Sequence, residues 1–227
     1  MSIGQLKINA IRLVGGVSVL DYLNTCDGRR PGTTLAAVVD KLSNLEEIVH
    51  WFLHAGLIGE AEHARSLDLV QQSSWHSLTA FQRLIDFRES LYRLFLRVAL
   101  GEAVESDELC ALNDVIVATA SQRVLVSAST GFAWAWRPCD TLDGMTAGFM
   151  GRIAVQAASL LTSPDLSRLR LCALPDCDWL FVDTSRNGRR RWCQMNVCGA
   201  KEKARRAVAE PNTQAHQKSG ADTALHR

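Results

Sequence analysis

Two pairs of closely spaced cysteines near the C-terminal end constrain this chain most strongly. Cys172 and Cys177 form one Cys-x4-Cys pair, Cys193 and Cys198 form the second, and 15 residues separate the pairs. Zinc prefers four soft or borderline ligands in a tetrahedron, and two short loops that each supply two thiolates satisfy this with little backbone strain. The spacing therefore predicts that these four cysteines bind one structural zinc ion. A site filled by four thiolates has no open position for catalysis.

Three other roles for the four cysteines remain open from their spacing. They could be buried without a metal, they could form a redox dithiol, although such sites usually have the spacing Cys-x2-Cys, or they could hold an iron–sulfur cluster. The chain has 227 residues and seven cysteines, an odd number that does not suit a closed set of disulfides. The opening residues show no secretory signal, and no apolar run is long enough to span a membrane. We therefore expect a cytoplasmic protein with reduced thiols.

The residues around the cysteines predict the shape of the zinc module. The segments DWLFVD and RRRWC flank Asn187-Gly188, and Asn-Gly is a strong hairpin signal because both positions must tolerate positive φ. The segment GAKEKARRAVAE favours a helix that begins near Cys198, where the helix dipole stabilises a thiolate. We therefore expect a C-terminal treble-clef-like zinc module, built in the order knuckle, hairpin, knuckle and helix.

The larger N-terminal part of the chain is predicted to be mainly α-helical with one small β-hairpin. Ser43 and Glu46 form a capping-box pattern, and Gly56 stands where a helix C-terminal glycine belongs. Apolar residues recur at helical spacing in this and four further segments. The expected helices cover residues 43–56, 60–72, 77–101, 106–120 and 142–161. Residues 123–136 instead alternate around a Ser-Thr-Gly turn, which indicates the hairpin, with Trp134 and Trp136 on one face and in the core.

Charge is distributed unevenly along the chain, although the net charge is only +1. Residues 168–206 carry ten basic and four acidic side chains, a local charge of +6, which leaves −5 for the remainder. A basic module on an acidic body indicates a patch that binds phosphate. The candidate DNA contacts lie beside the Asn187-Gly188 turn and on the helix that follows: Arg186, Arg189, Arg190, Arg191, Lys201, Lys203, Arg205 and Arg206.

The basic residues also have a simpler interpretation. Four thiolates and one Zn²⁺ ion carry a charge of about −2, so part of the basicity could balance the metal site and the rest could be a solvated face. Trp179 and Trp192 could stack on bases, but an aromatic residue next to a zinc ligand more often packs the small core of such a module. Charge alone therefore leaves nucleic-acid binding open.

Two parts of the sequence together resemble a known family. The first is Cys172, Cys177, the segment LFVDTSRNGRRRWC, Met195, Cys198-Gly199 and the basic helix beyond, and it resembles the bacterial CGNR zinc finger. The second is VSVLDYLNT, the helical middle and the segment IAVQAASLLTSPDLSRLRLC, and it resembles the ABATE domain that usually precedes this finger. The resemblance implies a stress-related transcription regulator whose finger binds DNA. Ala200-Lys201 replaces the Asn-Arg of the family motif, and a lysine offers a point charge where arginine would bind in a bidentate way.

Other candidate residues lie in the N-terminal part. Asp21 and Asn24 in LDYLNT could line the pocket of a sensory domain, or they could be turn and cap residues. His50 and His54 have the spacing of a metal-binding pair, but they lack the Glu of a His-Glu-x-x-His motif and are interpreted as packing or surface residues. The three remaining cysteines stand singly and are interpreted as small buried apolar residues: Cys26, Cys110 and Cys139.

These observations predict three parts: a mainly helical ABATE-like domain at residues 1–166, a CGNR-type finger at 167–210 and a disordered tail at 211–227. The predicted function is DNA binding in transcription regulation, with an N-terminal domain that senses a small-molecule effector or dimerises. We expect a homodimer, because one small basic module would hold DNA weakly. The main alternative is a zinc-stabilised protein-interaction module without DNA binding. No phosphate loop, nucleophile elbow or acid/base pair is present in the sequence, so we predict no enzyme activity. A third possibility is an enzyme that uses the LDYLNT region, with zinc only structural.

Overall fold

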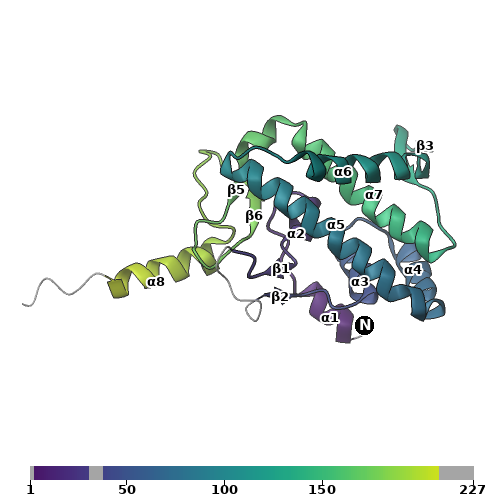
Figure 1. The fold of residues 1–227 in the computed structure, drawn as a ribbon, viewed down its shortest axis with the longest axis horizontal. Coiled ribbons are helices and arrows are strands. Elements are labelled where there is room, and N and C mark those ends of the chain that lie inside the picture. The colour runs from purple at the N-terminus through teal and green to yellow at the C-terminus, as the bar shows by residue number, and fades with distance from the viewer. Residues whose placement is uncertain (1–2, 31–37, 210–227) are drawn as a thin grey trace, which may run out of the picture.

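The computed structural model describes residues 3–30 and 38–209 (Figure 1). The helices in these ranges are α1 (Ile3–Asn9), α2 (Ser18–Leu23), α3 (Leu45–His54), α4 (Glu60–Gln72), α5 (Ser74–Leu100), α6 (Ser106–Thr119), α7 (Leu142–Leu161) and α8 (Ala200–Ala209). The strands form three antiparallel pairs: β1 (Cys26–Asp27) with β2 (Val39–Asp40), β3 (Arg123–Ala128) with β4 (Gly131–Trp136), and β5 (Leu169–Leu171) with β6 (Leu180–Val182). This confirms the predicted fold class, and the tail expected at residues 211–227 lies outside the described residues.

Helix α5 forms the centre of the helical domain. Helices α2, α3, α6 and α7 all contact it, and its predicted apolar stripe is buried from Leu84 to Phe95. The predicted inner face of α7 is buried as well, and Phe149 on that face stacks on Phe52 of α3 with ring centroids 4.1 Å apart. Such close contacts are typical of a well-packed core. Within residues 3–30 and 38–209, no helix is long and apolar enough to cross a membrane.

The predicted helix ends are largely confirmed, with one shift at the start of α3. The backbone of Gly56 has φ +68°, as a glycine after a helix C-terminus requires. The N-cap, however, is Asn44 and not Ser43, because the Asn44 side chain accepts a hydrogen bond from the Glu47 N–H at 2.9 Å. The Glu47 carboxylate accepts in return from the backbone N–H of Ser43 at 2.6 Å. Asn44 and Glu47 therefore cap α3, with the carboxylate reaching the N–H of the residue before the N-cap.

The β3–β4 hairpin forms where it was predicted, but its aromatic face is not in the core. Trp134 is 57% exposed, because no other element covers the outer part of this hairpin among the described residues. Trp136 at its base is half-buried beside Gly151 of α7. The expectation for the single cysteines is confirmed for Cys26, which is buried, and is wrong for Cys110, which is exposed.

The hairpin predicted across Asn187-Gly188 does not form, because β6 pairs with a different strand from the one expected. Gly188 does adopt φ +61° in a turn, but β6 pairs with β5 and not with the arginine-rich segment 189–191. All three residues of β6 are buried, so its neighbour must be largely apolar, and a run of three arginines would carry charge into the core. The outer edge of β6 is also occupied, because the Val182 N–H donates to the Gly15 carbonyl at 2.8 Å.

Asn24 joins the N-terminal segment to the same edge of β6. Its amide N–H donates to the Leu180 carbonyl at 2.8 Å, and its side-chain oxygen accepts from the Leu180 N–H at 2.9 Å. Asn24 is 1% exposed, so water does not reach the N–H and the carbonyl of Leu180, and the Asn24 side chain is their partner. This pair of bonds completes the strand that leads out of the first cysteine loop.

We expect Asn24→Ala to destabilise the whole fold. The substitution leaves a buried N–H and a buried carbonyl of Leu180 without partners, which costs about 3 kcal/mol in free energy of unfolding. Urea unfolding followed by circular dichroism measures this cost. The matched control is Asn113→Ala at an exposed position of α6, which should change the free energy by less than about 0.5 kcal/mol. Equal effects of the two substitutions would contradict the structural role of Asn24.

Candidate metal centre and basic surface

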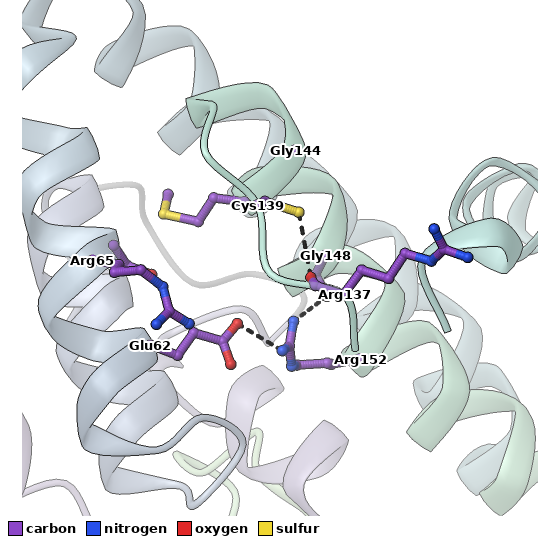
Figure 2. Close-up of a pocket in the computed structure, with 9 residues that line it drawn as sticks. Glu62, Arg65, Arg137, Cys139, Gly144, Gly148 and Arg152 are labelled. Carbon is purple, nitrogen blue, oxygen red and sulfur yellow. Dashed lines mark hydrogen bonds and ion pairs between the residues drawn. The ribbon is translucent and has the colours of Figure 1, made fainter. Parts of the chain in front are cut away.

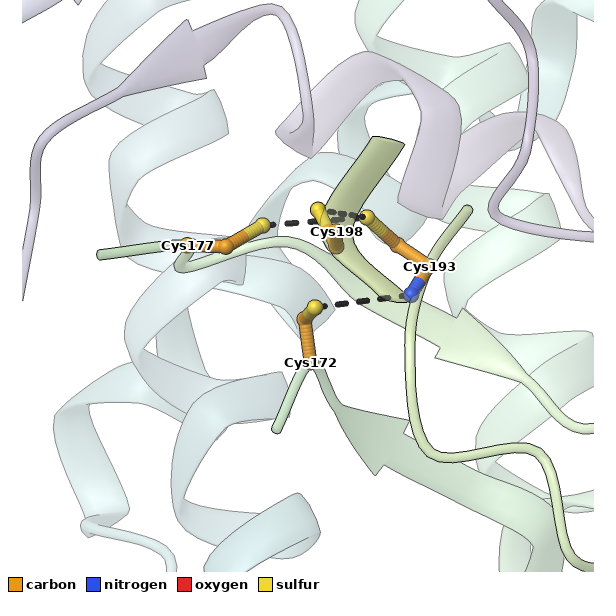
Figure 3. A group of neighbouring side chains, drawn as sticks. All are labelled: Cys172, Cys177, Cys193 and Cys198. Carbon is orange, nitrogen blue, oxygen red and sulfur yellow. Dashed lines mark hydrogen bonds between the residues drawn. The ribbon is translucent and has the colours of Figure 1, made fainter. Parts of the chain in front are cut away.

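The four predicted cysteine ligands come together at one point (Figure 3). Cys172 and Cys177 lie in the loop between β5 and β6, Cys193 precedes a π-helical turn at Met195–Gly199, and Cys198 lies in that turn. Their sulfur atoms all lie within 4.8 Å of one another, with 3.7 Å between Cys177 and Cys193 and 3.5 Å between Cys193 and Cys198. A tetrahedral site with metal–sulfur bonds of about 2.3 Å places its sulfurs roughly 3.8 Å apart. The cluster therefore has the dimensions of a site for a single metal ion.

The surroundings of the sulfurs suit a metal-bound cluster. The backbone N–H of Cys193 points at the Cys172 sulfur at 3.4 Å, and such N–H donors stabilise thiolates. The pKa of the Cys172 thiol is lowered, because the thiols of Cys177 and Cys193 donate hydrogen bonds to its sulfur. The pKa of Cys177 is raised by its hydrogen bond to Cys172, and burial raises that of Cys198. Four thiolates at this distance need a cation between them, so binding of a metal must displace thiol protons.

The first cysteine loop is fixed by an arginine of the N-terminal domain. The Arg30 guanidinium donates to the carbonyls of Cys172 at 2.6 Å, Leu174 at 3.2 Å and Cys177 at 2.6 Å. One planar cation thus holds three backbone carbonyls of the loop that carries two of the four sulfurs. The metal centre is therefore built on the helical domain and is not a separate unit.

A second set of contacts holds the end of the same loop. The backbone N–H of Arg29 donates to the Asp178 carboxylate at 2.6 Å, and the Tyr92 hydroxyl donates to the Asp178 carbonyl at 3.0 Å. The Arg29 guanidinium lies over the Tyr92 ring at 3.5 Å from its centroid. None of these residues was identified from the sequence, because no local pattern distinguishes an arginine that binds distant carbonyls.

Arg190 lies in a different place from the one expected for a DNA contact. Its guanidinium donates to the carbonyls of Val14 at 3.1 Å, Trp192 at 3.1 Å and Cys193, and it lies over the Phe181 ring. These bonds leave the side chain partly buried and directed into the protein. Arg190 thus joins the second cysteine loop to the N-terminal segment, as Arg30 does for the first loop.

The other seven predicted DNA contacts are exposed. Two of them, Arg205 and Arg206, form ion pairs with Glu202 at 3.1 and 2.9 Å, so their charge is partly neutralised. The remaining five have no carboxylate partner among the described parts of the chain, and they lie on the turn before Cys193 and at the start of α8: Arg186, Arg189, Arg191, Lys201 and Lys203. We call these five residues the basic surface.

The two tryptophans beside the ligands pack on the metal centre. Both are partly buried against the cluster of cysteine residues, as the packing interpretation predicted. Arg191 lies over the Trp192 ring at 5.4 Å. The indole N–H of Trp179 donates to Asp27. Trp179 also lines a cavity of about 250 Å³ that borders Cys177 and Lys201.

Asp21 and Asn24 have partners within the protein. The Asp21 carboxylate accepts from the Gly15 N–H at 2.7 Å, and Asn24 binds Leu180 as described above. Burial raises the pKa of Asp21. These contacts agree with turn and cap roles, and the ligand-binding role of the two residues stays a prediction.

Another cluster of polar residues lies between α4 and α7 (Figure 2). Arg152 donates to the Glu62 carboxylate at 2.7 Å and to the Gly148 carbonyl at 3.1 Å, and Cys139 is directed at the Arg137 carbonyl. The cavity beside them measures about 10 Å³, roughly the space of a single water molecule. Burial raises the pKa of the Cys139 thiol, which makes it a poor nucleophile. This cluster is therefore too small for a substrate.

The contacts of His50 and His54, the two histidines with metal-binding spacing, are also clear from the structure. His50 and His54 do not face a common ligand, since the His54 ring bonds to the Ile11 carbonyl at 2.8 Å while His50 lies 2.9 Å from the His63 ring. Both side chains therefore have packing roles, as interpreted from the sequence.

We expect the purified chain to hold one metal ion, and Cys193→Ser to lose it. Cys193 lies between two other sulfurs of the cluster, so its removal opens the tetrahedron. Elemental analysis of the purified protein measures the metal content per chain. Cys110→Ser, at an exposed cysteine outside the cluster, is the matched control and should keep the full metal content. A full metal content in Cys193→Ser would show that the ion binds elsewhere.

Comparisons with known families agree with this arrangement. The family model of the CGNR zinc finger matches residues 168–210 and so includes all four cysteines. The ABATE model, described as "Putative stress-induced transcription regulator", matches residues 16–164, more than half of the chain. No curated protein matches the chain. Neither family is a family of enzymes. The chain therefore belongs to the ABATE family, whose model carries that description, and has a CGNR zinc finger at its C-terminal end.

Proposed function

We propose that this protein is a cytoplasmic transcription regulator that binds DNA through its basic surface. The observation that carries the proposal is the position of five exposed cations without carboxylate partners, in the described residues, on a module fixed by four cysteines. Phosphate contacts of arginine and lysine supply most of the affinity of a protein for DNA. The rigid attachment of the module keeps these charges on one body and limits the entropy lost on binding.

We propose Zn²⁺ as the ion at the four cysteines. An iron–sulfur cluster needs several irons and sulfides between its cysteine ligands, and sulfur atoms within 4.8 Å of one another leave room for one ion only. The thiolate set then leaves no open coordination position, so the ion is structural. Its charge, together with the thiolates, leaves a net negative centre that attracts the nearby N–H groups and arginines.

We further propose that the helical domain makes the protein a homodimer. A single basic surface of five charges would hold DNA weakly at physiological salt, and two linked surfaces raise the apparent affinity by effective concentration. The effector predicted for this domain stays a prediction. The alternative function, a module that binds an acidic protein, uses the same five charges and is separated by the experiment below.

The test is the salt dependence of binding of the full-length protein to a random DNA duplex. Five phosphate contacts contribute about −4.5 to the slope of log K against log salt for each basic surface that touches DNA, so a dimer that uses both surfaces should have a slope of about −9. The double substitution Arg189→Ala/Lys201→Ala should weaken binding and reduce the magnitude of the slope by about two for each basic surface that touches DNA. Fluorescence anisotropy at a series of salt concentrations measures both.

The control substitution is Arg65→Ala, at an exposed arginine of α4 outside the basic surface. It should leave both the affinity and the slope unchanged. A wild-type protein with no affinity for DNA at low salt, but saturable binding to an acidic protein, would establish the alternative function. A binding constant that does not respond to salt would also exclude the proposed surface.

A further inference from the structure

The outer part of the β3–β4 hairpin presents an apolar surface with no partner among the described residues. Leu125 pairs with Trp134 and Ser127 pairs with Phe132, so the three large side chains lie on one face of the hairpin. Leu125 is 61% exposed, Phe132 81% and Trp134 57%. We call Leu125, Phe132 and Trp134 the hairpin patch.

The hairpin patch is about as large as the largest apolar patch that a typical monomer exposes. With about 150–250 Å² for each large side chain, the exposed fractions of the hairpin patch amount to on the order of 400 Å². Patches of this size are often functional. Both strands also have a free edge, because β3 and β4 pair only with each other among the described residues. An isolated two-stranded hairpin is only marginally stable in water, so a cover for this one would stabilise it.

The sequence of the hairpin lacks the features that protect exposed strands. Residues 124–136 contain no charged residue and no proline, whereas natural edge strands usually carry lysine or proline that blocks pairing with another chain. Arg123 at the base of the hairpin lies over the Trp134 ring at 4.5 Å, so its charge borders the hairpin patch beside Trp134. An uncharged hairpin with free edges is suited to a partner that also offers an uncharged edge.

We propose that the hairpin patch is covered by the same hairpin of a second copy of this chain. In a twofold-symmetric contact the same surface is used by both copies, with residue i of one against residue j of the other. The uncharged side chains of this hairpin can therefore meet in such a contact without burying an unpaired charge on either side. The hairpin patch supplies about half of the roughly 800 Å² per partner that a stable interface buries. Helix α6, which leads into β3, also carries two exposed apolar side chains, Val117 at 76% and Leu109 at 42%.

The position of the hairpin leaves the metal module free in such a dimer. Figure 1 shows β3 and α8 at opposite ends of the longest axis of the molecule. A dimer joined at the hairpins therefore presents two basic surfaces, one from each copy. The inference names the interface for the homodimer in the proposed function, and its test does not depend on DNA.

The first test is the mass of the full-length protein in solution by sedimentation equilibrium. The wild type should have twice the chain mass of 25.0 kDa, and Leu125→Glu should raise the dimer dissociation constant by roughly 30-fold or more. The matched control is Leu78→Glu on α5, because Leu78 is 72% exposed but lies outside the hairpin patch, and this variant should remain a dimer. Circular dichroism and metal content confirm that each variant is folded.

A second measurement keeps the test decisive if Leu125→Glu disturbs the hairpin. A photo-crosslinking phenylalanine analogue at position 132 should link two copies of the purified protein, and the same analogue at position 78 should not. A wild type that is monomeric at all concentrations, or a dimer that survives Leu125→Glu with no crosslink at position 132, would overturn the proposal. A crosslink in cell extract to a different protein only, with a monomeric purified chain, would overturn it as well. A dimer that does not bind DNA would leave this inference intact and refute the proposed function.

Discussion

The four sulfur atoms can meet because backbone carbonyls of the first cysteine loop are bound by Arg30 of the N-terminal domain. A loop that carries two metal ligands has many conformations, and each must be excluded before the ligands can form half of a tetrahedron. Here the guanidinium supplies several directed hydrogen bonds to that loop, and Asn24 fixes the strand that follows it. The helical domain therefore preorganises the metal site before the ion binds.

Arg190 provides the same kind of contact for the second loop, with the carbonyls of Val14 and Cys193. The two arginines explain why a module with few apolar residues of its own does not need a large core. The small cluster of Cys172, Phe181 and Cys193 rests on the main core through β6, whose Leu180 and Val182 belong to that main core. Metal binding and the packing of the helical domain are thus coupled, and loss of the ion should loosen contacts on both sides of β6.

Local patterns predicted what local interactions determine. The cluster of four cysteines followed from their spacing, and the ends of α3 and α5 followed from Gly56 and Gly101, whose positive φ requires glycine. The Asn187-Gly188 turn formed for the same reason, but the partner of β6 could not be found locally. That choice depends on Gly15 and Asn24, which lie more than a hundred residues earlier in the sequence and occupy the outer edge of the strand.

Arg190 and Trp134 have surroundings that differ from those predicted, and both show the same limit of local sequence patterns. The sequence alone gives Arg190 the same basic character as Arg189 and Arg191, and only the position of distant carbonyls directs it inward. Trp134 was expected in the core because strand alternation identifies a shared face, but alternation does not say whether anything covers that face. The clustering of the four cysteines, in contrast, was predictable residue by residue, because the spacing that suits a metal site imposes strict distance requirements on its side chains.

The proposed DNA contacts of the basic surface and the proposed hairpin dimer together imply how such a protein would select DNA. Arg186, Arg189 and Lys203 suit phosphate contacts, which fix position on the duplex but carry no sequence information. Lys201 stands where the family motif has arginine, so a bidentate contact to a base edge is absent at that position. A single module of this kind would bind many sequences with similar affinity. Two modules joined through the hairpins would instead bind best where two favourable sites lie at the separation that the dimer sets, so geometry would supply the selectivity that one surface lacks.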